Sequence, residues 1–179
     1  MKNIILTGCS NGIGKVLSQR LSSTYCVYGI DTEVPLHLYC DHFYQCDIRD
    51  TKALDLVMRS IEQNVDSLYA LVNNAGLFDK TVLEKQNLDV WDKVMAVNVR
   101  APYQLALHYA SLLGFSRGHI INIASTRARM SEAGTEAYSA SKGALLALTH
   151  ALAASLSGKV SVNAISPGWI NTDESYVPS

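Results

Sequence analysis

The chain of 179 residues is long enough for one domain with a substantial core and too short for two comfortable ones, so we expect a single domain over residues 1–179. Its 48% hydrophobic and 17% charged residues are typical of a folded globular protein and exclude a disordered one. The formal net charge of -1 gives no basis for binding nucleic acid or an anionic membrane, and neither is expected as a partner.

The chain enters a strand pattern at once, at 4–7, without the charged and apolar regions of a signal peptide. No apolar run reaches the length of a membrane-spanning helix, so we expect a cytoplasmic protein. The four cysteines (Cys9, Cys26, Cys40 and Cys46) lack metal-ligand spacing, and a cytoplasmic protein is not expected to hold a disulfide framework. We interpret them as buried apolar residues, with Cys9 in a turn as the one candidate for a reactive thiol, and expect no metal.

A glycine-rich turn follows the first strand and leads into a helical pattern. The segment 8–14 reads Gly-Cys-Ser-Asn-Gly-Ile-Gly. Glycines let the backbone approach a pyrophosphate, and a helix N-terminus offers free N–H groups. The spacing differs from the common G-x-G-x-x-G, and a tight structural turn would look the same. Because the turn joins the first strand to the first helix, we predict a dinucleotide site that includes Gly8, Ser10, Asn11, Gly12 and Ile13.

An acidic residue ends the second predicted strand, 25–30. Asp31 lies about 20 residues beyond the glycines, where a carboxylate can bind the ribose 2′-hydroxyl of NAD and repel the 2′-phosphate of NADP. Glu33 adds to that repulsion, and no Arg or Lys follows to accept a phosphate. The alternative is an aspartate that only caps a turn. Given the upstream glycines, we favour the cofactor role, with NAD in preference to NADP.

Strands and helices alternate along the rest of the chain. Four more strands are expected, at 43–46, 68–72, 118–125 and 160–165. Helices are expected after the third strand, from about residue 88, and from Ala137. Only a short segment separates Asp31 from the third strand, so we expect a loop there instead of a crossover helix. This alternation predicts an α/β fold, a Rossmann-type doubly wound parallel sheet with helices on both faces.

Tyr138 and Lys142 are four residues apart in the last predicted helix, so they lie on one face, one turn apart. A nearby ammonium stabilises a phenolate and prepares the phenol for proton transfer. The pair alone is a weak signal, because short motifs match by chance. Ser125 ends the fifth predicted strand. Asn98, inside an apolar helix, is either a satisfied core amide or a functional one.

Taken together, these motifs resemble the short-chain dehydrogenase/reductase family over essentially the whole chain. The glycine turn looks like the family's cofactor turn, and Asn73-Asn74-Ala75-Gly76 looks like its signature after the fourth strand. Asp47-Ile48 matches the acidic position that meets the adenine ring, and the segment 167–172 resembles the one that holds the nicotinamide carboxamide. The resemblance thus implies further cofactor contacts at Asp47, Ile48, Asn74, Ala75, Gly76, Tyr138, Lys142, Pro167, Gly168, Ile170 and Thr172.

The resemblance also implies a catalytic tetrad and a reaction. Tyr138 would be the general acid for reduction and the base for oxidation, assisted by Lys142, which would also bind the nicotinamide ribose. Ser125 would hold the substrate oxygen, and Asn98 would anchor a water that links Lys142 to solvent. The expected function is an NAD(H)-dependent oxidoreductase that interconverts a secondary alcohol and a carbonyl by hydride transfer.

The chain also departs from the family. Members normally continue past the Pro-Gly segment through a substrate-covering helical stretch to a last strand, whereas this chain stops at Ser179. We therefore expect a fold that lacks that strand and that segment. The alternative function is a catalytically weak or inactive binding or interaction protein. The short segment after Asp31 is a second departure and thins one wall of the adenine pocket.

Two other enzyme classes are less favoured. A hydrolase using Ser141 and Lys142 is a poor fit, because adjacent helical residues point about 100° apart. A sugar-nucleotide epimerase could share Tyr138 and Lys142, but its glycine turn usually has a different spacing.

Expectations about partners come from the family as well. Helices corresponding to those from about Asp89 and from Ala137 pair across subunits in the family, so a homodimer or homotetramer is expected. The substrate is expected to be a small alcohol or carbonyl compound whose identity is open. Three charged residues precede Tyr138 and are candidates for lining its pocket: Arg127, Arg129 and Glu132.

Overall fold

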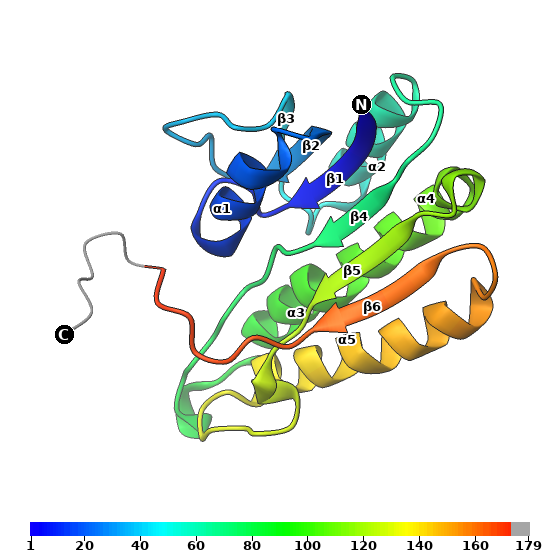
Figure 1. Ribbon diagram of the computed structural model, residues 1–179. Helices are drawn as coiled ribbons and strands as arrows, with labels where there is room; N and C mark the ends of the chain where they lie inside the picture. The colour runs from blue at the N-terminus through cyan, green and yellow to red at the C-terminus, as the bar shows by residue number, and fades with distance from the viewer. Residues whose placement is uncertain (173–179) are drawn as a thin grey trace.

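The computed structural model describes residues 1–172 and has a parallel sheet at its centre (Figure 1). Six strands pair in the order β3-β2-β1-β4-β5-β6. Their bounds are β1 Lys2–Thr7, β2 Tyr25–Asp31, β3 His42–Gln45, β4 Ala70–Asn73, β5 His119–Ile123 and β6 Ser161–Ile165. The predicted parallel sheet is confirmed. The strand order reverses between β1 and β4, and ligands of such sheets bind outside the carboxyl ends of the strands at that point.

Five α-helices connect the strands. They are α1 Gly12–Leu21, α2 Thr51–Glu62, α3 Leu88–Met95, α4 Ala101–Ser116 and α5 Glu136–Ser155. A segment of π-helix, Ala96–Arg100, joins α3 to α4, so the long helix predicted from residue 88 is interrupted around Asn98. The Asp50 carboxylate caps α2 by accepting hydrogen bonds from the backbone N–H groups of Lys52 and Ala53, at 2.9 and 3.1 Å.

The two faces of the sheet are covered unequally (Figure 1). On one face α2, α4 and α5 enclose the larger core, in which Ile5, Leu71 and Ile120 have no exposed surface. On the other face α1 packs on β1 and β2. The central strands read as near-continuous apolar runs because both of their faces are buried. Helices therefore lie on both faces as predicted, but within residues 1–172 none covers β5 and β6 on the side of α1.

That uncovered side carries an apolar hollow of about 360 Å³. Its lining includes Leu17 and Leu21 of α1, Ile121 and Ile123 of β5, and Ile165 of β6. In the described part of the chain β6 forms one edge of the sheet. This agrees with the expectation that no further strand pairs with β6 within these residues. None of the helices described has the length and apolar character needed to cross a membrane.

The connection from β2 to β3 is a loop, as predicted. Residues 32–41 contain neither helix nor strand. Three apolar side chains of this loop are exposed, with fractions of 66% for Val34, 99% for Leu36 and 56% for Leu38. These three side chains therefore add little to the core, whereas Cys40 of the same loop is buried in the cluster under α1.

Candidate active site

Glycines allow the first turn to pack directly against the end of β4. Gly8 has a φ of 68°, in the left-handed region, and a Cβ there would lie 2.8 Å from the Ala75 Cα. A Cβ on Gly14 would lie 1.7 Å from the Gly8 carbonyl oxygen, so no larger residue fits. The Asn74 amide donates hydrogen bonds to the carbonyl oxygens of Thr7 and Gly8, at 3.1 and 2.8 Å. The predicted cofactor turn and the segment after β4 thus form one unit.

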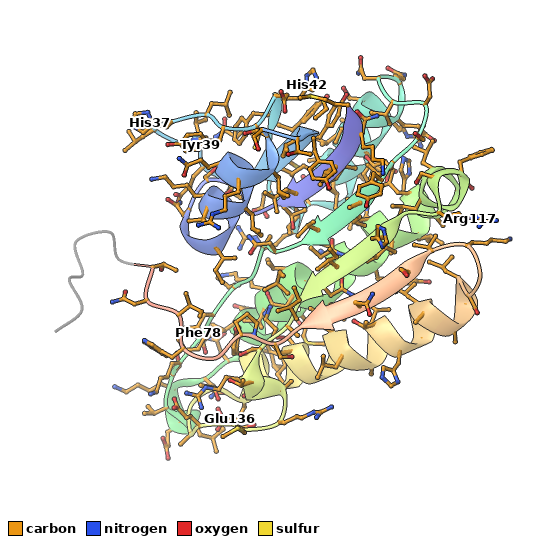
Figure 2. The ribbon with its side chains drawn as sticks, in the orientation of Figure 1. His37, Tyr39, His42, Phe78, Arg117 and Glu136 are labelled. Atoms are coloured by element: carbon orange, nitrogen blue, oxygen red, sulfur yellow. The ribbon has the colours of Figure 1, made fainter. Side chains whose placement is uncertain are left out.

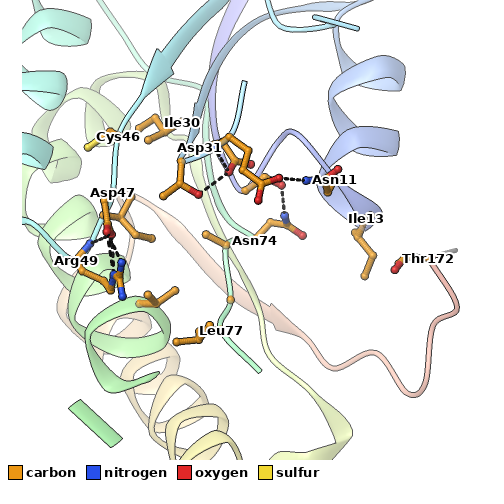
Figure 3. A pocket seen from close by; sticks show the side chains of 18 residues that line it. Asn11, Ile13, Ile30, Asp31, Cys46, Asp47, Arg49, Asn74, Leu77 and Thr172 are labelled. Atoms are coloured by element: carbon orange, nitrogen blue, oxygen red, sulfur yellow. Dashed lines mark hydrogen bonds and ion pairs between the residues drawn. The ribbon is translucent and has the colours of Figure 1, made fainter. Parts of the chain in front are cut away.

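A cavity of about 540 Å³ opens in front of this unit, at the carboxyl ends of β1, β2 and β4 (Figure 3). Most of the predicted cofactor residues line it. They are Gly8, Asn11, Gly12, Ile13, Asp31, Asp47, Ile48, Asn74, Ala75, Gly76 and Thr172. Ser10 does not line the cavity; its backbone N–H donates to Asp31 and its hydroxyl donates to the Glu33 carbonyl oxygen at 2.6 Å.

Asp31 both caps the turn and faces this cavity (Figure 3). One carboxylate oxygen accepts from Ser10 N–H at 2.9 Å, and the other accepts from Glu33 N–H at 3.2 Å. The Glu33 carboxylate accepts from the Asn11 amide at 2.8 Å. The two interpretations of Asp31, a turn cap and a cofactor ligand, are therefore compatible. These bonds hold two carboxylates beside the cavity.

A third carboxylate in the cavity has a cationic partner. Both oxygens of Asp47 accept hydrogen bonds from the Arg49 guanidinium, and the closest contact is 2.6 Å. These hydrogen bonds lower the pKa of the Asp47 carboxyl. Arg49 does not follow Asp31 in the sequence; it enters the cavity from the segment after β3, the strand that pairs with β2, and therefore had no signal beside Asp31.

A second cavity of about 300 Å³ adjoins the first. Its predicted lining residues are Ser125, Tyr138, Lys142, Pro167, Gly168, Ile170 and Thr172. The two cavities share Ile13, Asn74, Gly76 and Thr172. The glycine turn and the Tyr138–Lys142 pair, distant in the sequence, thus lie along one continuous depression.

Lys142 is buried at the base of the second cavity, with 3% of its surface exposed. Its ammonium donates a hydrogen bond to the Ile123 carbonyl oxygen at 2.8 Å and lies 5.6 Å from the centre of the Tyr138 ring. Burial lowers the pKa of Lys142 to about 8, because desolvation disfavours the charged form. A Cβ on Gly76 would lie 3.3 Å from this nitrogen, so a small residue is favoured there.

Tyr138 is half-buried, and Phe78 packs edge-on against its ring with a centroid separation of 4.9 Å. The Phe78 side chain, labelled in Figure 2, comes from the segment that leaves β4 and is 50% exposed. Ser125 is buried, and its hydroxyl oxygen accepts a hydrogen bond from the Arg127 backbone N–H at 3.1 Å. This bond fixes the serine oxygen at the cavity wall.

Asn98 lies behind the cavities and lines neither of them. Its side-chain oxygen accepts from Leu77 N–H at 2.8 Å, and its amide donates to the Leu77 carbonyl oxygen at 3.0 Å and to the Ser141 hydroxyl at 2.9 Å. The side chain is therefore a satisfied core amide that holds the segment after Gly76 against α5. It stands in the π-helical segment, a distortion that is frequent at functional sites.

Several lining residues carry no motif of their own. Leu77 and Val97 line the first cavity, and Phe78 and Trp169 line the second. Their positions beside known motifs were the only signals in the sequence.

Of the three charged residues considered as candidates before Tyr138, only one lines the second cavity. Arg127 lines it, whereas Arg129 lines a separate hollow. Glu132 forms ion pairs with Arg127 and with Lys80, the latter at 3.4 Å. This ion-pair group connects the loops on the two sides of the Tyr138 cavity.

The family of the chain follows from its match to a known family model. The model described as short chain dehydrogenase matches residues 2–176. The chain belongs to this family. The resemblance inferred from the motifs is thereby confirmed, and the fold agrees with it.

Two curated relatives show how far the similarity reaches. An uncharacterized oxidoreductase of Thermotoga maritima is 42% identical over 134 residues, which are 74% of this chain and 52% of the relative. The 2-dehydro-3-deoxy-D-gluconate 5-dehydrogenase of Pseudoalteromonas atlantica is 33% identical over 96% of this chain and 73% of its own length. The chain thus spans about half of the first relative and about three quarters of the second.

A solved structure extends the comparison to three dimensions. The structure of 4-hydroxyisoleucine dehydrogenase complexed with NADH superposes with a TM-score of 0.89 at 29% identity. It covers 98% of this chain and 77% of the other. The short chain dehydrogenase family uses NAD or NADP, and this chain shares the family's nucleotide-binding architecture.

Proposed function

We propose that this chain binds NAD along the two adjoining cavities and transfers hydride between it and an alcohol or carbonyl compound. The continuity of the two cavities supports this proposal most directly. A dinucleotide that starts beside Asp31 and follows the shared residues Ile13 and Gly76 would end beside Tyr138 and Lys142. A binding function alone would not require a buried ammonium beside a phenol at that end.

The residues of the first turn fit the nucleotide's pyrophosphate. The α1 helix begins at Gly12 without a side-chain cap on Asn11, so its first N–H groups are available to an anion. Gly12 has a φ of 54°, a left-handed conformation that glycine adopts at the lowest cost. Because it has no side chain, a ligand can approach the backbone closely at this position. The bound nicotinamide would supply or accept the hydride.

The chain's own residues would position the substrate and move the proton. Tyr138 would give its phenolic proton to the carbonyl oxygen in reduction and take it back in oxidation. The Lys142 ammonium would stabilise the phenolate left behind, which its burial makes more effective than in water. Ser125 would donate a hydrogen bond to the same substrate oxygen. Asn98 would support this group through Leu77 and Ser141.

Three carboxylates support a preference for NAD. Asp31 and Glu33 stand where the adenine ribose is expected, and a 2′-phosphate would meet their negative charges. Arg49, the cation in the lining of this cavity, is already paired with Asp47.

The cofactor proposal is tested by titrating the chain with NADH and with NADPH. We expect tighter NADH binding, and we expect Asp31→Ser to narrow or reverse the preference, because it removes a carboxylate from the ribose site. The control is Asp66→Ser, which changes an exposed carboxylate that does not line the cavity. Wild-type chain that binds NADPH more tightly would contradict the role of Asp31.

The catalytic proposal is tested with a panel of secondary alcohols and ketones. Tyr138→Phe is expected to lower turnover by a factor of about 10² to 10⁴, the usual contribution of a positioned general acid, with NADH binding retained. Phe78→Leu is the matched control because it changes the ring that packs on Tyr138 without removing a proton donor. NADH binding without turnover in the wild-type chain would favour the alternative, a catalytically weak binding protein.

We also propose that the chain forms a homodimer or homotetramer through α4 and α5. Tyr103 and Leu107 expose 48% and 65% of their surface on α4. Tyr103 and Leu148 line a shallow hollow between these helices. Light scattering of the wild-type chain and of Leu107→Lys tests this proposal, and a monomeric wild-type chain would contradict it.

A further inference from the structure

Two cysteine thiols meet beneath the glycine turn. Cys9 belongs to the turn and Cys40 to the loop between β2 and β3, the loop on which Figure 2 labels His37 and Tyr39. Both sulfurs pack on Gly29 of β2: a Cβ there would lie 2.7 Å from the Cys9 sulfur and 2.4 Å from the Cys40 sulfur. Two sulfurs so close to one point are neighbours, and the two thiols are hydrogen-bonded.

The two thiols differ in their readiness to lose a proton. The hydrogen bond from Cys9 lowers the pKa of the Cys40 thiol, whereas the same interaction and burial raise the pKa of Cys9. Cys40 is therefore the more acidic of the two thiols and the one that loses its proton first. The thiolate is the nucleophilic form of cysteine, so Cys40 is the thiol expected to react first, and its closeness to Cys9 above Gly29 makes Cys9 the partner for the second step.

The loop that carries Cys40 is attached mainly at its ends. The Ser10 hydroxyl holds the Glu33 carbonyl at one end, and the Asp41 carboxylate accepts from Val27 N–H at 2.8 Å at the other. Between these points the exposed apolar residues add few buried contacts. Segments of this kind open locally at low cost in free energy. A small oxidant can thus reach Cys40, which is 7% exposed, without unfolding of the sheet.

We propose that Cys9 and Cys40 are a reversible oxidation site, which a hydroperoxide converts into a disulfide. The Cys40 thiolate attacks the outer peroxide oxygen and breaks the O–O bond; this forms a sulfenic acid and releases an alcohol, or water from hydrogen peroxide, after proton uptake. The Cys9 sulfur then attacks the Cys40 sulfur while its proton passes to the departing hydroxyl of the sulfenic acid, which forms the S–S bond, breaks the S–O bond and releases water. In total two thiols and one hydroperoxide give one disulfide, one alcohol and one water.

The disulfide would act on the nucleotide site proposed above. A disulfide bond of about 2 Å is shorter than a contact between thiols, so its formation draws Cys9 towards Cys40. Cys9 lies between Gly8, at the cavity wall, and Ser10, whose N–H holds Asp31. Displacement of this turn is expected to weaken NADH binding several-fold. This consequence rests on the proposed function, whereas the thiol chemistry does not.

The first test is chemical and needs no nucleotide. The folded chain is treated with hydrogen peroxide, and its free thiols, intact mass and cross-linked peptides are measured. We expect the loss of two thiols, a mass lower by two hydrogen atoms, a peptide pair joining Cys9 to Cys40, and full reversal by dithiothreitol. Cys26→Ser should behave in the same way because it leaves the pair intact.

Variants of the pair separate the two roles. Cys9→Ser should stop at a Cys40 sulfenic acid, which dimedone traps, whereas Cys40→Ser should form no disulfide at Cys9. If the folded wild-type chain keeps both thiols, or if peroxide joins other cysteines instead, the proposal is overturned, whether or not the variants fold.

NADH titration of the reduced and oxidised wild-type chain tests the consequence separately. Equal affinity in the two states would overturn the effect on the nucleotide site. Absence of NADH binding in the reduced chain would count against the proposed function, whereas the peroxide experiment would still decide whether the thiol pair exists.

Discussion

At the scale of single residues, the site depends on a cation held away from water. Lys142 is almost fully buried and has the Ile123 carbonyl as its hydrogen-bond partner. Its pKa of about 8 lies below the ordinary value of 10.5, so the unfolded chain binds this proton more readily than the folded one. Folding stability must therefore rise with pH between these two values. The free energy lost below about pH 8 is the cost of keeping a charged ammonium buried beside Tyr138.

Lys142→Met tests this linkage. A pKa shift of this size corresponds to at most about 3 kcal/mol. Between about pH 8 and about pH 10.5 the free energy of unfolding of the wild-type chain should therefore rise by up to that amount relative to that of Lys142→Met. The comparison removes the effect of groups that titrate in both proteins. Denaturant unfolding across this range is the measurement, and parallel pH profiles would contradict the lowered pKa.

At the scale of elements, the interrupted helix between α3 and α4 positions the site from behind. The π-helical segment places Asn98 where its amide meets both backbone groups of Leu77 and the hydroxyl of Ser141 on α5. One side chain thus connects three elements: the helix, the segment after β4 and α5. Because Asn98 has no exposed surface, its loss leaves these partners without water to replace it.

Asn98→Ala is therefore expected to cost about 2 to 4 kcal/mol, the result of leaving more than one buried polar group unpaired. The matched control is Asn163→Ala, which changes an exposed asparagine of β6 and should alter the free energy of unfolding by less than about 0.5 kcal/mol. Chemical denaturation of both variants is the measurement. A cost for Asn98→Ala as small as that of the control would argue against its bracing role.

At the scale of the whole molecule, the unequal cover of the sheet distinguishes its two faces. One face has a closed core under α2, α4 and α5, and the other has an open apolar hollow beside α1. Ile165 exposes 54% of its surface at the rim of that hollow. Exposed apolar surface of this kind binds apolar dyes and promotes association.

We expect the chain to enhance the fluorescence of the dye ANS, and Ile165→Lys to reduce that enhancement. The substitution should change the free energy of unfolding by less than about 1 kcal/mol, because the side chain is already half exposed. Val34→Lys, on the β2–β3 loop away from the hollow, is the control. Equal dye fluorescence in the wild type and in Ile165→Lys would show that the hollow does not bind the dye.

The sequence was sufficient wherever a property depends on local pattern. The apolar runs 4–7 and 68–72 predicted their strands to within two residues of the observed bounds, because burial on both faces selects continuous apolar segments. The short segment after Asp31 excluded a crossover helix by its length alone. The order of the motifs was enough to identify the family.

Only the tertiary structure decided which side chains meet. Arg49 enters the nucleotide cavity beside Asp47, Phe78 packs on Tyr138, and Asn98 lies behind the site instead of in it. Nothing in the sequence indicated that Cys9 and Cys40 are neighbours, but their sulfur atoms pack side by side against Gly29. The physical reason is that periodicity records which face of an element is buried, whereas contacts between distant residues depend on how strand ends and loops converge at one edge of the sheet.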